Sequence, residues 1–160
     1  MAIASFLKVT AADGESKDAA HKGWTDIASF QWGVTQPGSM AVGGGGGTGK
    51  SSFQDLTVIC AIDKAMPAVM KHCASGKHLG EVKVSVCKAG GTQIEYELIT
   101  LTDVLVTNVS ITGAADDANV MVHYSFQAAK VKNEYSEQTD QGGKGAVSQF
   151  GWNVKENVEM

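Results

Sequence analysis

The clearest structural signal in the chain is the segment Glu81-Val82-Lys83-Val84-Ser85-Val86-Cys87-Lys88-Ala89-Gly90-Gly91-Thr92-Gln93-Ile94-Glu95-Tyr96-Glu97-Leu98. Apolar and polar residues alternate from Val82 to Val86 and again from Ile94 to Leu98, and this period of two is typical of β-strands. Residues 89–92 carry two glycines between the two runs, which is a tight-turn signal. The segment therefore predicts a β-hairpin, with strands over 81–88 and 93–101.

The same alternation recurs along most of the chain. In residues 53–60, for example, Leu56, Val58 and Cys60 fall on one side of an extended chain. Further strands are predicted over residues 3–9, 27–34, 103–112, 119–132 and 147–155.

One segment follows a helical period instead. Apolar residues recur at helical spacing after Asp63, which can cap the first free amides of a helix. Pro67 is close to the first turn, where proline costs little, and Gly76 suits the left-handed end of a helix. The residues expected on the apolar face are Met66, Val69, Met70 and Cys73.

These elements predict a mainly β fold. A chain of 160 residues fits one domain, over 1–160. We expect a compact β-barrel of two packed sheets, with one short α-helix over about 64–75 covering an open end. A long loop over about 35–52 has neither period and contains the run Gly43–Gly47. Loops of this length inside a compact domain are usually functional or disordered.

The charge pattern argues against nucleic acid as a partner. The net charge is −4, and all 13 basic residues are lysines, scattered along the chain. Arginine is the preferred residue for bidentate contacts to phosphate and guanine. No apolar run approaches the ~20 residues of a membrane-spanning helix, so no membrane insertion is expected.

The cysteines and the first residues indicate in which cellular compartment the protein folds. Cys60, Cys73 and Cys87 are odd in number and irregularly spaced, which does not suggest a disulfide framework and fits a reducing cytoplasm. Residues 1–8 lack the basic leader and long apolar core of a signal peptide.

One motif resembles a nucleotide site. The run from Gly44 to Ser51, Gly-Gly-Gly-Gly-Thr-Gly-Lys-Ser, matches the phosphate-binding pattern G-x-x-x-x-G-K-[ST]. A phosphate loop joins a buried strand directly to a helix, but here residues 53–59 are predicted as a strand. A flexible loop is therefore the preferred interpretation, and a nucleotide-binding protein is the alternative.

No other constellation predicts catalysis or a cofactor. Cys73 and His78 are a conceivable nucleophile pair, but Cys73 falls on the apolar face of the helix, where cysteine more often fills a core. The histidines and cysteines lack the paired spacing of a zinc site. We expect no enzyme activity, no catalytic or metal-binding residues and no cofactor.

The chain also contains a short internal echo. Phe30-Gln31-Trp32-Gly33-Val34 is similar to Phe150-Gly151-Trp152-Asn153-Val154, with two aromatic residues and a valine on one strand face in each case. This predicts two strands that share one core.

The order of several motifs resembles one protein family over essentially the whole chain. The opening Gly14-Glu15-Ser16-Lys17-Asp18 with His21-Lys22-Gly23-Trp24, the helix exit Cys73-Ala74-Ser75-Gly76-Lys77-His78, and the close Phe150-Gly151-Trp152-Asn153 are similar to those of the Hcp proteins. These proteins form the inner tube of the bacterial type VI secretion system.

The resemblance implies a structural role. It implies a homohexameric ring with an open lumen, rings stacked into a tube inside a contractile sheath, a VgrG spike at the tip, and effector proteins carried in the lumen. It also implies assembly in the bacterial cytoplasm, secretion without a cleaved signal peptide and, since the chain stops at Met160, no C-terminal effector extension. The long loop would contact neighbouring subunits and stacked rings through Gly38, Ser39, Met40, Gly43, Gly44, Gly45, Gly46, Gly47 and Lys50.

Overall fold

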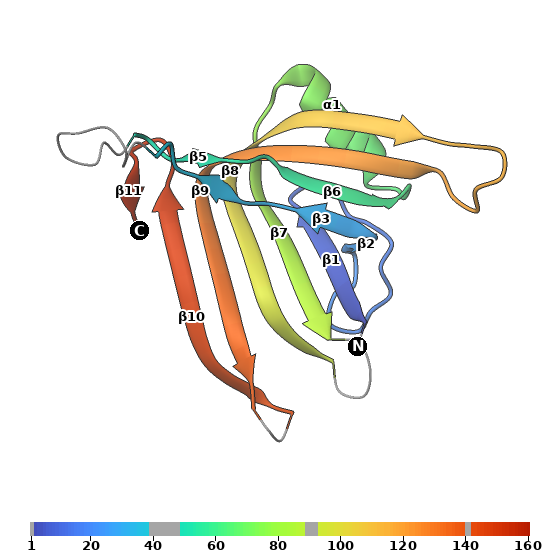
Figure 1. Ribbon diagram of the computed structural model, residues 1–160. Helices are drawn as coiled ribbons and strands as arrows, with labels where there is room; N and C mark the ends of the chain where they lie inside the picture. The colour runs from blue at the N-terminus through green and yellow to red at the C-terminus, as the bar shows by residue number, and fades with distance from the viewer. Residues whose placement is uncertain (1, 39–48, 89–92, 140–141) are drawn as a thin grey trace.

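The structure, a computed structural model, describes residues 2–38, 49–88, 93–139 and 142–160 (Figure 1). Strands make up most of this part of the chain, with one helix between the sixth and seventh strands. The elements in chain order are β1 (Ile3–Val9), β2 (Thr25–Ile27), β3 (Ser29–Gln31), β4 (Val34–Thr35), β5 (Ser52–Phe53), β6 (Leu56–Ala61), α1 (Met66–Ser75), β7 (Leu79–Lys88), β8 (Ile94–Thr112), β9 (Met121–Gln138), β10 (Lys144–Asn153) and β11 (Val158–Glu159).

The predicted hairpin is the centre of a large antiparallel sheet. Strands β7 and β8 pair from Lys88↔Ile94 to Leu79↔Val104, while the predicted turn at 89–92 lies outside the described residues. The sheet runs in the order β11-β10-β9-β8-β7-β1-β2. A second, two-stranded sheet is formed by β4 and β5. The mainly β fold with one short helix is confirmed.

The long strand β9 belongs to two parts of the structure. Its first residues pair with β6, from Ala61↔Met121 to Leu56↔Phe126, and its later residues pair with β10. Strand β8 accompanies β9 along nearly its whole length. Both strands therefore bend over the core, as Figure 1 shows.

The sheet curls round, but no continuous ladder of hydrogen bonds joins its two edges at β2 and β3. Strand β2 pairs with β1, whereas β3, one residue further along, pairs with β6. Between them the backbone N–H of Ala28 donates to the carbonyl oxygen of Ile59 at 2.8 Å. The two edges of the sheet are therefore bridged by the chain itself at 25–31, and the predicted barrel is open in its hydrogen bonding at this point.

Alternation places the core as predicted in β6 and β7. Leu56, Val58 and Cys60 are fully buried, and Val82 and Val84 face them from the opposite wall. The opposite face of β7 is also covered, because Ser85 and Cys87 are buried as well. Other fully buried large side chains are Tyr124, Phe126, Leu7, Leu101, Val69, Val104 and Val122.

The helix ends as predicted but begins differently. Gly76 takes a left-handed conformation with φ of 70°, and Pro67 lies in the first turn. The Asp63 carboxylate accepts from the backbone N–H of Ala65 at 3.0 Å, so it stabilises the turn before the helix rather than its first turn. Val69 is buried, but Met70 is exposed, which corrects its predicted place on the apolar face.

One predicted break does not separate two strands. The segments 93–101 and 103–112 form the single strand β8. Asp103 sits within it at φ of 55°, a left-handed conformation that is unusual for a non-glycine residue. At this residue the strand changes direction without ending. The alternation of side chains along the sequence does not reveal such a change of direction.

Candidate assembly site at the base of the arm

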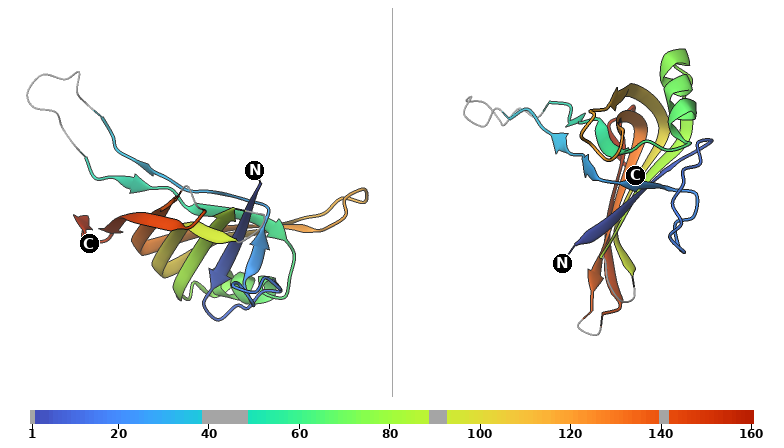
Figure 2. Two further views of the ribbon diagram at one scale, coloured as in Figure 1. Left: turned by 90° about the horizontal axis from the view of Figure 1, so that it is seen from below. Right: turned by 90° about the vertical axis from the view of Figure 1, so that its right-hand side faces the viewer.

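The two described ends of the loop predicted over 35–52 form a pair of limbs, residues 34–38 and 49–53, which we call the arm. Its base is the ribbon of β4 and β5, paired at Val34↔Phe53 and Thr35↔Ser52. The N–H of Gln54 donates to the carbonyl oxygen of Gly33 at 2.8 Å, which continues the ribbon toward the body. In Figure 1 and in the left view of Figure 2, β4 and β5 lie toward the end of the molecule opposite the tip of the β8–β9 hairpin.

Four aromatic side chains anchor this base. The rings of Trp32 and Phe53 are 6.0 Å apart, those of Phe53 and Phe150 are 6.4 Å apart, and those of Phe150 and Trp152 are 6.3 Å apart. All three pairs are stacked, with interplanar angles of 25°, 25° and 13°. The two halves of the sequence echo thus meet through Phe53. Trp32 and Trp152 both pack against the main core, as predicted, but Val34 and Phe150 are exposed, and Trp32 lies between β3 and β4 rather than within a strand.

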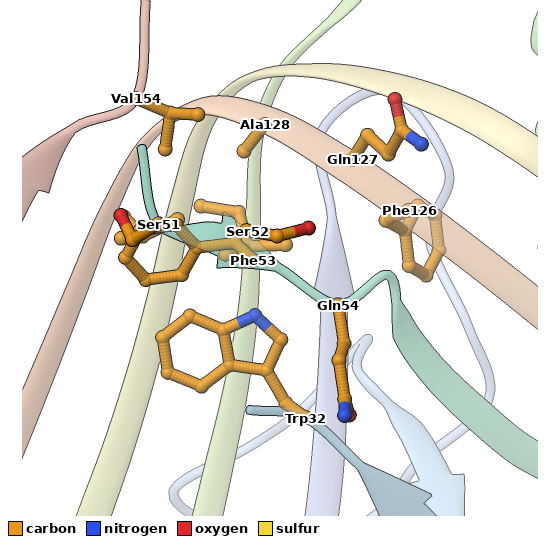
Figure 3. A pocket seen from close by; sticks show the side chains of 11 residues that line it. Trp32, Ser51, Ser52, Phe53, Gln54, Phe126, Gln127, Ala128 and Val154 are labelled. Atoms are coloured by element: carbon orange, nitrogen blue, oxygen red, sulfur yellow. The ribbon is translucent and has the colours of Figure 1, made fainter. Parts of the chain in front are cut away.

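Two hollows flank Phe53. One, of about 220 Å³, lies between the arm and the body, with Trp32, Gln54 and Phe126 around it (Figure 3). The other, of about 350 Å³, has more apolar walls and opens between Val34, Phe150 and Trp152. Phe150 is 41% exposed and Val34 is 51% exposed, so this second hollow presents a large apolar surface at the base of the arm.

The predicted site residues divide between the described and the undescribed parts of the arm. Gly38 and Lys50 are exposed on its two limbs. Ser39, Met40 and the glycines Gly43, Gly44, Gly45, Gly46 and Gly47 lie outside the described residues. The sequence reasoning missed the aromatic base itself, although the echo of Trp32 and Trp152 was a visible signal for it.

The phosphate-loop interpretation of Gly44–Ser51 is not supported. Ser51 leads directly into β5, and β6 follows from Leu56. A phosphate loop needs a helix at this point, because the free amides of the helix N-terminus complete the anion site. The helix that does follow begins only at Met66, beyond two strands.

A buried polar network around Ser85, near the C-terminal end of β7, was not predicted from the sequence. The Nδ1 atom of His21 lies 2.7 Å from the Oδ2 atom of Asp18, and its Nε2 atom lies 2.9 Å from the Oγ atom of Ser85. The Ser85 hydroxyl donates to the Glu95 carboxylate. Asp, His and Ser in this order resemble a nucleophile triad. Ser85 is completely buried, however, and its proton is committed to Glu95, so no substrate can reach it.

Cys73 packs against the core, as the sequence favoured, and does not form the conceivable pair with His78. Cys73 packs partly buried against the core, and the Nδ1 atom of His78 bonds the Oδ1 atom of Asp103 at 2.8 Å. Lys155 contacts the other oxygen of Asp103 at 3.3 Å. The hydrogen bonds from His78 and Lys155 lower the pKa of the Asp103 carboxyl below its usual value. This cluster ties the strand kink to the helix exit and the last turn of the chain.

Burial also shifts the pKa of groups inside the protein. It raises the pKa of the Cys60 thiol to about 12, with a smaller contribution from the charge of Asp63. It also raises the pKa of the Glu97 carboxyl, whose Oε1 atom has no hydrogen-bond partner among the described residues. Within residues 2–38, 49–88, 93–139 and 142–160, no group of His, Cys, Asp or Glu side chains is arranged to hold a metal ion. In the same part of the chain, the helix is too short and polar to cross a membrane.

Comparison with known proteins identifies the family. Residues 6–135 match the family model described as "Type VI secretion system effector, Hcp". The chain is 41% identical to protein hcp1 of Pseudomonas aeruginosa, over 99% of both chains. Its fold is similar to the crystal structure of Hcp1 from Salmonella typhimurium, with a TM-score of 0.84 and 34% identity over 100% of both chains. It is also similar to a structure titled as a type six secretion system protein, with a TM-score of 0.93 and 25% identity over 99% of this chain and 100% of the other. The chain therefore belongs to the Hcp family of type VI secretion proteins.

Proposed function

We propose that this protein is the ring-forming subunit of the type VI secretion tube, with no catalytic activity of its own. The observation that carries the proposal is its similarity to Hcp proteins along the entire chain, in sequence and in fold together. Six copies form a ring, rings stack inside the contractile sheath, and the VgrG spike tips the tube. The chain acts as one domain, assembles in the bacterial cytoplasm and is then secreted.

The edges of the large sheet support assembly through strands. Strand β10 is ten residues long, and β11 covers its outer edge only at Trp152 and Asn153 among the described residues. An edge strand with free N–H and C=O groups is a template for pairing with another chain. Closure into a ring requires a head-to-tail contact, in which one surface of a subunit meets a different surface of the next.

The polar face of the large sheet supports a water-filled lumen that carries effectors. On the side of the sheet away from the core, Lys83, Thr100 and Lys132 form a row across β7, β8 and β9. Short ion pairs on the same face join Lys83 to Glu81 at 3.5 Å and Lys132 to Glu134 at 3.4 Å. Because its positive and negative side chains are paired, this face stays hydrated and presents both charges to a protein in the lumen.

The oligomeric mass tests the proposal directly. Light scattering on the purified protein is expected to give six times the mass of one chain, and negative-stain microscopy is expected to show rings with a central hole. A protein that remains strictly monomeric at high concentration overturns the proposal.

A further inference from the structure

The tip of the β8–β9 hairpin is a projection that none of the described residues covers. All residues from Ile111 to Val120 are exposed, and Figure 1 shows the tip extending beyond the body. Ile111 is 48% exposed and Val120 is 38% exposed. Ile111 pairs with Val122, and Val120 follows two residues away on the same face. The stem of the tip therefore presents an apolar ridge.

The tip is also well formed. The N–H of Asp117 donates to the carbonyl oxygen of Ala114 at 3.1 Å, and the carbonyl oxygen of Val120 accepts from Ile62 at 2.9 Å. The first bond closes the turn, and the second ties the stem to the end of β6. Such a projection can enter a hollow with little loss of conformational freedom, which favours binding.

A matching hollow lies at the opposite end of the same molecule. It is the 350 Å³ hollow beside the arm, whose apolar walls include Val34, Phe150 and Trp152. Figure 1 and the left view of Figure 2 both place the arm and the hairpin tip at opposite ends. The two features cannot meet within one chain, but they can meet head to tail between copies.

Exposed side chains of opposite charge are found at the two ends. Asp116 and Asp117 are exposed at the tip, while Lys50 is exposed on the arm limb between Gly49 and Ser51, both of which line the hollow. Within each end, the charged side chain is a neighbour in sequence of the apolar surface: the acidic turn follows the stem of the tip, and Lys50 lies between two residues that line the hollow. Opposite charges at the rim of an apolar contact set the register and speed association.

We propose that the hairpin tip of one copy, residues 111–120, docks into the hollow at the base of the arm of a second copy. The contact is heterologous, since the tip and the hollow are different surfaces, and it therefore propagates through the assembly. This inference rests on the proposed ring assembly and names one of the contacts that joins its subunits. The observations that carry it are the two exposed apolar surfaces, their placement at opposite ends, and the presence of Asp116 and Asp117 at one end and Lys50 at the other.

Cysteine cross-linking tests the contact. The variant combines Val34→Cys and Val120→Cys with Cys73→Ser, which removes the most accessible native thiol, while Cys60 and Cys87 are buried. Mild oxidation of the assembled protein is expected to give covalent dimers and higher multimers on a denaturing gel without reductant. Each single-cysteine variant is expected to give none, because a heterologous contact pairs unlike residues.

A matched control uses Val147→Cys in place of Val34→Cys. Val147 is 54% exposed, as open as Val34 at 51%, but lies on β10 away from the hollow. Multimers with Val120→Cys paired to Val34→Cys, and not to Val147→Cys, support the docking. Equal cross-linking in both pairs, or none in either, overturns it.

Charge reversal gives a second readout. Lys50→Glu is expected to shift the assembly toward smaller species in light scattering at low salt, and Asp117→Lys in the same chain is expected to restore it. Assembly that is unchanged in Lys50→Glu, or a double variant that assembles no better than the single one, contradicts the proposal. Rings in the microscope without any specific cross-link refute this contact alone, whereas a monomeric wild-type protein refutes the proposed function as well.

Discussion

The Nε2 atom of His21 lies 2.9 Å from the Oγ atom of Ser85, although 64 residues separate them in the sequence. Phe6 stacks on the imidazole with ring centres 4.2 Å apart, and Trp24 meets its edge at 4.8 Å. Asp18 holds the other ring nitrogen at 2.7 Å. One buried side chain thus fastens the segment before β2 onto the outer face of β1 and β7.

Replacing His21 is expected to weaken the fold substantially. His21→Ala removes a packed ring and its two buried contacts with Ser85 and Asp18, so the free energy of unfolding should fall by about 2–4 kcal/mol. Urea unfolding at fixed protein concentration measures it, because assembly adds to apparent stability. His78→Ala is the control, since the His78–Asp103 pair is exposed to solvent and should contribute little to stability. Equal losses in both variants would contradict the fastening role.

Gly14 occupies a position with no room for a side chain. A Cβ atom there would lie 2.6 Å from the carbonyl oxygen of Trp24, a backbone atom that cannot move aside. Gly14→Ala should therefore lower the free energy of unfolding by about 2–3 kcal/mol, as overpacking does elsewhere. At Gly80 the added Cβ would meet only Thr10, at ordinary contact distances of 3.8 and 3.9 Å, so Gly80→Ala serves as the control. Thermal unfolding of the two variants that shows the same midpoint would refute the prediction.

The stability of the protein should depend on pH through Glu97. Burial raises the pKa of this carboxyl in the folded state above its ordinary value of 4.5. Below that value the group is protonated in both states and costs nothing. As the pH rises through 4.5 and toward the raised value, the unfolded state releases its proton first, so the folded state loses stability.

Glu97→Gln should remove this loss. The variant is expected to gain stability relative to the wild type between pH 4 and pH 7, and the gain should level off above the raised pKa. Urea unfolding across this pH range measures the difference. Glu156→Gln, in an exposed turn, controls for the loss of one negative charge. A difference between Glu97→Gln and wild type that is the same at pH 4 and pH 7 would show that the folded state does not perturb Glu97.

The thiols should react in a fixed order. Cys73 is partly exposed, whereas Cys60 and Cys87 are buried, and the pKa of Cys60 is raised to about 12. Since the thiolate is the reactive form, an aromatic disulfide reagent at pH 8 should modify Cys73 first. Cys73→Ser is expected to abolish the fast phase, and Cys60→Ala is expected to leave it intact. A fast phase that survives in Cys73→Ser would show that a buried thiol becomes accessible in the native protein.

Local pattern was enough to predict the elements of this fold. Alternation over 81–88 and 53–60 predicted β7 and β6 together with their buried faces, because the side chains of a strand point to opposite faces with a period of two. Helical spacing with Pro67 and Gly76 at its ends predicted α1 to within about two residues. Both signals are contained within about a dozen residues, so they can be recognised without knowledge of the rest of the chain.

The amino-acid sequence by itself determined that this protein is β-rich with one helix, it predicted a long glycine-rich loop, and the order of its motifs already resembled the Hcp family. Only the tertiary structure decided that β9 divides its pairing between β6 and β10, that His21 meets Ser85, and that Phe53 joins the two halves of the Trp32 and Trp152 echo. It also placed the hairpin tip and the arm at opposite ends of the molecule. The physical reason is that these contacts join segments far apart in the chain. Such contacts depend on how the whole core packs. The periodicity of a single strand shows which of its faces is buried, but not which distant residues pack against that face.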